Sequence, residues 1–288
     1  MKKNPIFLIL SAACLLALAG AGCSQRAKTS HNLNLADQLF DSGQFDKAET
    51  EYLNALKAEP RNAKAIGRLG LIYFDEGRFQ KAAPYLFKGS QLASTNLELR
   101  VKLAQIYLAL GEFKHAQEQA DFVLKNNPSD TDAPVLLAQS APPGQIADLQ
   151  KQVRVLAASG DSAPLETALA ILAARQNNFK PALEYFQRAL KLDPRFAPAY
   201  AALGNAYLQF NQPEKAGAAF KAASDCASDT SPLQTEYGQF EIQSANLPAA
   251  EVFFNGLIQK EPDYIPAWLG MAEVNLDERK LDDSAAAL

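Results

Sequence analysis

The sequence reads GQFDKA at residues 43–48, GRFQKA at residues 77–82 and GEFKHA at residues 111–116. Each stretch begins 34 residues after the previous one and keeps the same glycine, phenylalanine and alanine. The alanine of this pattern returns at the same spacing in a second run, at Ala182, Ala216 and Ala250. A period of about 34 residues is typical of a helix-turn-helix unit that cannot bury its apolar face alone, so such units stack into a solenoid. The period therefore predicts an all-α protein.

Seven units follow when each is numbered from one to 34, with first residues at 29, 63, 97, 163, 197, 231 and 265. Position eight is small in every unit: Ala36, Gly70, Ala104, Ala170, Gly204, Gly238 and Ala272. Position 20 is alanine in six units and Ser284 in the seventh. Small residues at both positions are expected where the two helices of a hairpin approach each other closely. Position 32 is proline in four units, and proline ends a helix because it lacks an amide hydrogen.

The turn between the two helices of a unit falls at position 15. Gly43, Gly77 and Gly111 occupy this position in the first three units, and glycine adopts a positive φ without steric cost. Asn177 and Asn211 occupy it in two later units, and asparagine is among the next most tolerant residues for that geometry. We expect a left-handed backbone at all five residues.

The pattern resembles the tetratricopeptide repeat. That family has a small residue in the middle of the first helix, glycine at the turn, alanine and an aromatic residue in the second helix, and proline at its end. The resemblance covers residues 29–288 apart from residues 131–162. It implies a right-handed α-α superhelix of about seven to eight helical hairpins, whose concave groove binds protein or peptide partners.

The units fall into two runs. Residues 29–130 hold three repeats, residues 131–162 read as a degenerate helical hairpin around Pro142-Pro143-Gly144, and residues 163–288 hold three repeats plus a truncated fourth. We expect the degenerate hairpin to bend the superhelix. The last unit stops at Leu288, position 24 of 34, so we expect either a fragment of a longer protein or a partner that covers this end.

Residues 1–22 resemble a bacterial lipoprotein signal peptide. Lys2 and Lys3 precede an apolar stretch, and Ala21-Gly22 leads into Cys23. In that family the cysteine is diacylated and becomes the first residue of the mature protein, so residues 23–30 would form the lipidated N-terminus and linker. Gly20 departs from the family pattern, which more often has leucine there. The alternative is an uncleaved anchor helix, because the apolar stretch approaches the roughly 20 residues that span a bilayer.

The resemblance also implies a location. Ser24 follows the cysteine, whereas an aspartate there is the family's usual signal for retention in the inner membrane. We therefore expect an outer-membrane lipoprotein that faces the periplasm, with inner-membrane anchoring as the less favoured reading. Several acyl chains on Cys23 would anchor the protein stably, which a single chain does not achieve.

Composition and motifs argue against several functional classes. The formal charge is −4, which disfavours nucleic acid as a partner because a nucleic-acid footprint needs clustered Lys and Arg. His31 and His115 are the two histidines and lie far apart in the array, which disfavours a metal or acid–base cluster. Cys226 has no histidine nearby, and its expected state is a buried free thiol. We predict no catalysis, no cofactor and no small-molecule substrate.

Partner binding is expected in the concave groove, lined by positions two, five, six, nine, 12 and 13 of each first helix. In the first run these positions give Asp37, Phe40, Asp41, Lys64, Arg68, Asp75 and Lys102. In the second run they give Ala201, Asn205, Leu208, Gln209, Thr235, Gln239, Ile242 and Gln243. Asn and Gln can satisfy both the donors and the acceptors of a peptide backbone. The predicted partner-binding residues are Lys64, Arg68, Lys102, Asn205, Leu208, Gln209, Gln239, Ile242 and Gln243.

The alternative for each of these residues is an ordinary solvated side chain. Relatives that bind chaperones hold a terminal carboxylate with Lys and Asn at positions five and nine. The first unit has Leu33 and Asp37 there, which disfavours such a carboxylate clamp.

Together these features predict a lipid-anchored periplasmic scaffold for protein–protein interaction in envelope assembly or export. The resemblance points to lipoproteins of pilus, exopolysaccharide or outer-membrane complexes without choosing among them. Two alternatives stay open. One is an accessory or regulatory part of a larger enzyme whose catalytic domain lies beyond residue 288, and the other is a structural spacer.

Overall fold

The computed structural model describes residues 29–158 and 160–277. All regular secondary structure within these residues is helical, which confirms the predicted all-α solenoid. The predicted signal peptide, Cys23, Ser284 and the end of the last unit lie outside the described residues. Among the helices that are described, none combines the length and the apolar character needed to cross a bilayer.

Six hairpins follow the predicted register. Their helices are residues 29–41 with α2 (Phe45–Ala58), α3 (Ala63–Asp75) with α4 (Phe79–Leu92), α5 (Leu97–Ala109) with α6 (Phe113–Asn126), α9 (Ala163–Arg175) with α10 (Phe179–Leu192), α11 (Ala197–Gln209) with α12 (Pro213–Cys226), and α13 (Pro232–Gln243) with α14 (Leu247–Lys260). A further first helix, α15 (Ile265–Asp277), follows α14. The hydrophobic core is a row of clusters along the array, as expected when each unit packs on its neighbours.

The turns have the predicted left-handed backbone. Gly43, Gly77 and Gly111 each have φ of 73°, while Asn177 and Asn211 have φ of 61° and 56°. The same position in the next unit is Ala245, which has φ of 58° although its side chain disfavours this geometry. The repeat therefore imposes the turn even where the local sequence does not prefer it.

Small residues allow the close helix crossings that the repeat pattern predicts. A Cβ atom added to Gly70 would lie 2.8 Å from Leu86 Cδ2, and one added to Gly204 would lie 2.7 Å from the Phe220 ring. Ala182 on α10 is completely buried. These crossings set the angle at which the helices of each hairpin meet, and so the curvature of the array.

The degenerate hairpin joins the two runs by an irregular route. It consists of the short helix α7 (Ala133–Ser140), the 3₁₀ turn η1 (Pro143–Gln145) and α8 (Ile146–Ala157). α7 packs against α6 on one side and α9 on the other. Arg175 of α9 donates hydrogen bonds to the carbonyl oxygens of Ala138, at 2.7 Å, and Ala141, at 2.5 Å, and so completes the C-terminal end of α7.

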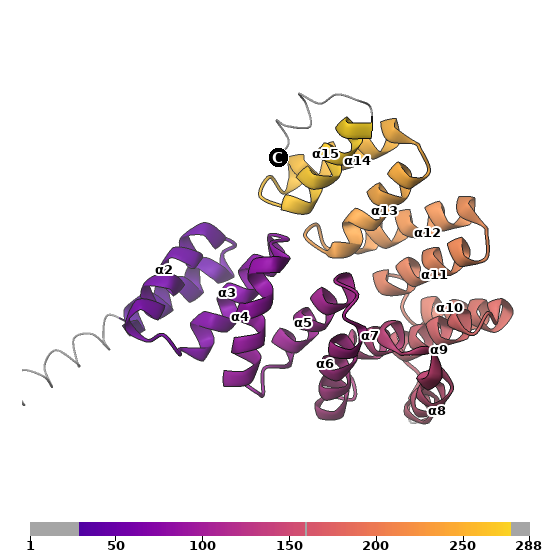
Figure 1. The fold of residues 1–288 in the computed structure, drawn as a ribbon, viewed down its shortest axis with the longest axis horizontal. Coiled ribbons are helices and arrows are strands. Elements are labelled where there is room, and N and C mark those ends of the chain that lie inside the picture. Colours follow the sequence, from indigo (N-terminus) through magenta and orange to yellow (C-terminus); the bar gives the residue numbers. More distant parts are fainter. Residues whose placement is uncertain (1–28, 159, 278–288) are drawn as a thin grey trace, which may run out of the picture.

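The array curls until its last described helices approach the first run (Figure 1). The Ile265 amide at the start of α15 donates to the Glu76 carbonyl between α3 and α4, at 3.3 Å. Beside this contact, a Cβ atom on Gly77 would overlap the ring of Pro266. The contact between α15 and the α3–α4 turn therefore closes the superhelix.

Candidate functional site

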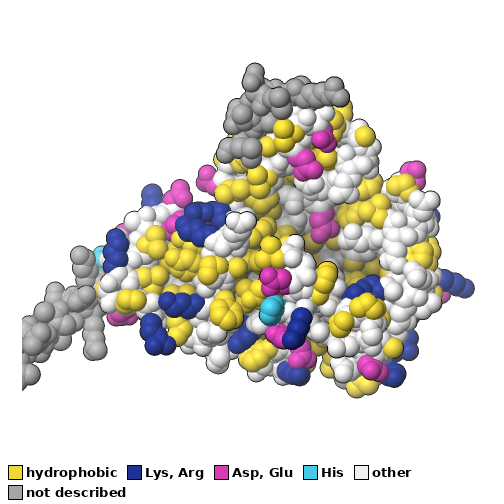
Figure 2. Space-filling model, in the orientation of Figure 1, with side chains coloured by type: hydrophobic (Ala, Val, Ile, Leu, Met, Phe, Trp, Pro, Cys, Tyr) yellow, Lys and Arg dark blue, Asp and Glu magenta, His cyan; other side chains and the backbone are white. Residues whose placement is uncertain are grey.

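The interior of the curl contains a pocket of about 440 Å³. One wall comes from the first helices α3, α5 and α7, and the other from the α12–α13 loop and the start of α13. Figure 2 shows that the surface between the first run and α13–α15 is hollowed and bordered largely by hydrophobic side chains. A cavity of this size holds a few side chains or a small ligand.

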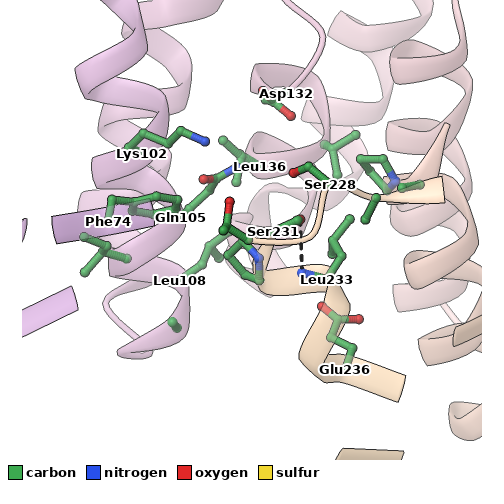
Figure 3. A pocket seen from close by; sticks show the side chains of 18 of the residues that line it. Phe74, Lys102, Gln105, Leu108, Asp132, Leu136, Ser228, Ser231, Leu233 and Glu236 are labelled. Carbon is green, nitrogen blue, oxygen red and sulfur yellow. Dashed lines mark hydrogen bonds between the residues drawn. The ribbon is translucent and has the colours of Figure 1, made fainter. Parts of the chain in front are cut away.

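The first wall carries most of the charge. Asp75 stands at the end of α3, and Asp132 stands directly before α7. Lys102 extends from α5 toward Asp132 (Figure 3). The Lys102 Nζ atom lies 4.6 Å from the centroid of the Phe74 ring. Burial raises the pKa of the Asp75 and Asp132 carboxyls above the usual range, and the positive charge of Lys102 opposes this shift only in part.

The opposite wall presents Glu236 from α13. Ser231 caps the start of this helix: its Oγ atom accepts a hydrogen bond from the Leu233 amide at 3.3 Å, the dashed line in Figure 3. The Glu236 Oε2 atom is shielded from solvent and accepts no hydrogen bond from any described residue. Burial raises the pKa of the Glu236 carboxyl to about 7.

A second unpaired polar group faces the pocket from α5. The side-chain Oε1 atom of Gln105 is also buried and has no hydrogen-bond partner among the described residues. Buried polar groups are nearly always paired, because leaving one unpaired costs the free energy of its lost hydration. Both groups are therefore open to pairing with a molecule that enters the pocket.

The structure separates the predicted groove residues of the first run. Lys102 lines the pocket. Lys64 forms an ion pair with Asp37 at 2.5 Å, and the guanidinium of Arg68 stacks 4.3 Å from the centre of the Phe40 ring. Those two side chains therefore contact their own run and lie outside the pocket.

The predicted residues on α11 are exposed outside the pocket. Asn205 and Leu208 lie on the surface. Gln209 donates hydrogen bonds to the Ala174 carbonyl at 2.8 Å and to Asn177 Oδ1 at 3.0 Å. Gln209 thus ties α11 to the turn of the preceding unit.

The predicted residues on α13 also lie away from the pocket. Gln239 donates to Glu273 on α15 at 3.0 Å, and Gln243 is exposed. Ile242 is buried in the core of the last units, so it offers no apolar surface to a ligand. The nine predicted residues do not form one site.

Three residues that matter most were not among the predicted ones. Gln105 and Glu236 stand at positions nine and six of their units, which the groove rule includes, so the register could have found them. Asp132 belongs to the degenerate hairpin, where no register exists to place it. Within the part of the chain that the structure describes, no three His, Cys, Asp or Glu side chains gather as metal ligands, and the Cys226 thiol is half-buried and free.

Fold and pocket together define an all-α solenoid of helix-turn-helix units with a polar site on its inner surface. Sequence models described as tetratricopeptide repeat match residues 33–95, 73–140 and 173–235, more than half of the chain. The chain belongs to the tetratricopeptide repeat family. Proteins of this family mediate protein–protein interactions, and their scaffold fold is typically non-catalytic.

Similar curated proteins share the array at low identity. DnaJ homolog subfamily C member 3 of Homo sapiens is 23% identical over 228 residues, which is 79% of this chain and 42% of that protein. Anaphase-promoting complex subunit 7 of Arabidopsis thaliana is 26% identical over 155 residues, which is 42% of this chain and 28% of that protein. The chain thus spans less than half the length of these relatives.

Solved structures agree on the fold. A tetratricopeptide repeat protein from Parabacteroides merdae superimposes with a TM-score of 0.53 at 16% identity, covering 86% of this chain and 99% of that one. The APC/C hetero-tetramer Cut9–Hcn1 gives a TM-score of 0.52 at 14% identity, covering 90% of this chain and 57% of that one. At such low identity the likeness shows the architecture alone.

Proposed function

We propose that this chain is a non-catalytic scaffold that holds a segment of a partner protein in the pocket between α5 and α13. The carrying observation is the pair of unpaired buried groups, Gln105 Oε1 and Glu236 Oε2, on opposite walls of one cavity. A bound segment would supply the hydrogen bonds that the folded chain leaves unmade. The cavity of about 440 Å³ fits a few side chains, so the partner inserts a short segment rather than a domain.

A photocrosslinking amino acid placed in living cells tests this proposal. We expect the substitution at Leu108, which lines the pocket, to form a discrete covalent adduct with another protein. The matched control is Val155 on α8, whose side chain is 72% exposed and lies outside the pocket. An adduct at Leu108 and none at Val155 supports the proposal. Equal labelling at both positions, or none at Leu108, contradicts it.

The proposal includes the compartment. The lipoprotein-like segment before Cys23 supports a protein anchored by its lipidated N-terminus, facing the periplasm from the outer membrane and serving envelope assembly or export. Metabolic labelling with a palmitate analogue tests the anchor. We expect label on the wild-type chain and none on Cys23→Ser, and a heavier precursor when lipoprotein processing is blocked. Retained labelling of Cys23→Ser would overturn the anchor while leaving the pocket proposal intact.

A further inference from the structure

We infer that the pocket receives a lysine or arginine side chain of the partner protein, with Glu236 as its counter-ion. This inference rests on the proposed function, because it names the chemistry of the segment held at the same site. It depends on the distribution of charge around the pocket, on the unpaired state of Glu236 and on the apolar lining beside it.

The pocket is acidic overall. The carboxylates of Asp75, Asp132 and Glu236 line it together with one ammonium group, that of Lys102. Lys102 lies on the first wall and acts on both Asp75 and Asp132. Glu236 comes from α13 on the opposite wall, apart from this group (Figure 3). With these groups ionised, the first wall keeps one net negative charge, and Glu236 adds a second on the opposite wall, where no cation of the lining accompanies it.

The unpaired carboxyl group of Glu236 favours a cationic ligand over an anionic or an apolar one. Its Oε2 atom is buried and has no donor among the residues that the structure describes. An ionised carboxylate in this position is stabilised most by a charged donor, since hydrogen bonds between two charged groups are about twice as strong as neutral ones. An anionic ligand would be repelled, and a purely apolar one would leave the oxygen unpaired.

The lining also fits the stem of such a side chain. Phe79, Leu108 and Leu233 contribute apolar surface to the same pocket. Lysine and arginine place their methylene groups along apolar surface while the charged end reaches a polar partner. The Gln105 carbonyl offers a further acceptor to a guanidinium or ammonium group. A segment with an inserted basic side chain can therefore pair with Glu236, while Gln105 on the opposite wall is open to a second donor of the same segment.

Selection from a phage library of random dodecapeptides on the full-length protein tests the inference. We expect the peptides retained by the wild-type protein to be enriched at least about fivefold in lysine or arginine at one position. The same selection on Glu236→Gln should lose this enrichment, because the amide keeps the shape of the side chain but not its charge. The control is Glu184→Gln on the exposed face of α10, which should retain the enrichment.

A double-mutant cycle with one selected peptide then locates the contact. Replacing its basic residue by norleucine, or Glu236 by glutamine, should each weaken binding by at least about tenfold, and both changes together should cost little more than either alone. Additive losses would place the basic residue elsewhere and overturn the inference. Competition by free spermidine as strong as that of the peptide would also overturn it, because a small polycation would then be the ligand.

The remaining outcomes separate the inference from the proposed function. If the retained peptides bind in the pocket but are enriched in acidic or neutral residues, the inference of a basic side chain is refuted. The proposed peptide-binding function then still stands. If no peptide is retained by the folded protein and Leu108 forms no adduct in cells, both proposals fail. Circular dichroism of each variant confirms that the helical array is intact in every arm.

Discussion

Glu236 is a residue whose environment in the folded chain opposes its charge. Burial raises the pKa of this carboxyl to about 7 from an ordinary value of 4.5. A carboxyl whose pKa is higher in the folded chain binds its proton more tightly there, so ionisation destabilises the folded state. This penalty is absent below the unfolded pKa and complete above about pH 7. Glu236 thus lowers the stability of the unliganded protein at neutral pH.

Glu236→Gln should therefore stabilise the protein in a pH-dependent way. At about pH 8 we expect the free energy of unfolding to rise by up to about 3 kcal/mol, and at about pH 4 the two proteins should be equal. Urea denaturation at both pH values measures the difference. The exposed control Glu184→Gln should change stability by less than about 0.5 kcal/mol at either pH. A Glu236→Gln protein that is less stable at the higher pH would contradict this expectation.

Ala245 is a second residue whose side chain disfavours the conformation that the fold imposes on it. Its φ of 58° is left-handed, and its side chain makes this conformation unfavourable. We expect Ala245→Gly to raise the free energy of unfolding by about 0.5–1 kcal/mol, since glycine removes the steric strain but adds flexibility to the unfolded chain. Thermal denaturation measures the gain. The reverse change at an equivalent turn, Gly111→Ala, should lower stability, and a gain there would refute the argument.

Some of the interhelix turns could be predicted from the sequence, and one could not. Glycine and asparagine prefer positive φ, so the turns at Gly43 and Asn177 could be predicted from residue type. Alanine has no such preference, and Ala245 adopts the turn because the two helices that it joins pack as in the other units. Residue type alone could not have predicted it.

At the scale of elements, α7 depends on a side chain from another helix. The fork of Arg175 reaches the carbonyl oxygens of Ala138, Gln139 and Ala141, where α7 ends. We expect Arg175→Met to cost about 2–3 kcal/mol, because it leaves the carbonyl groups of the buried residues Ala138 and Ala141 unpaired while keeping most of the apolar stem. Urea denaturation measures the loss of stability.

A matched arginine provides the control. Arg154 on α8 is exposed and donates one hydrogen bond to the Tyr185 hydroxyl at 3.1 Å. Arg154→Met should cost less than about 0.5 kcal/mol. Equal losses for the two variants would show that Arg175 contributes only packing. The apolar residues of the degenerate hairpin (residues 131–162) were enough to predict that it is helical. The capping of α7 by Arg175 could not be predicted, because the acceptors are backbone carbonyl groups, which every residue carries.

At the scale of the whole molecule, the contact between α15 and the α3–α4 turn sets the shape. Gly43, Gly77 and Gly111 share a φ of 73°, but only Gly77 has atoms of Pro266 where its Cβ would stand. Replacing each glycine by alanine should cost about 1 kcal/mol for the turn itself. We expect Gly77→Ala to cost a further 1–3 kcal/mol, roughly the penalty of overpacking.

Solution scattering distinguishes the two effects. Gly77→Ala should increase the radius of gyration because the contact with α15 is forced apart, whereas Gly43→Ala and Gly111→Ala should leave it unchanged. Equal dimensions for all three variants would show that the curl does not depend on this contact. This contact could not be predicted from the sequence, because it depends on the small rotation between neighbouring units, added over the whole array. The pocket between Lys102 and Glu236 could not be predicted for the same reason.

The contact between Ile265 and Glu76 also changes how the repeats depend on one another. In an open solenoid each unit senses only its immediate neighbours, so distant units lose structure independently. Here the second and seventh units are joined directly, and local opening of either one removes support from the other. Amide hydrogen exchange in α3 and α15 should therefore slow or quicken together, as in a single foldon, although most of the chain lies between them.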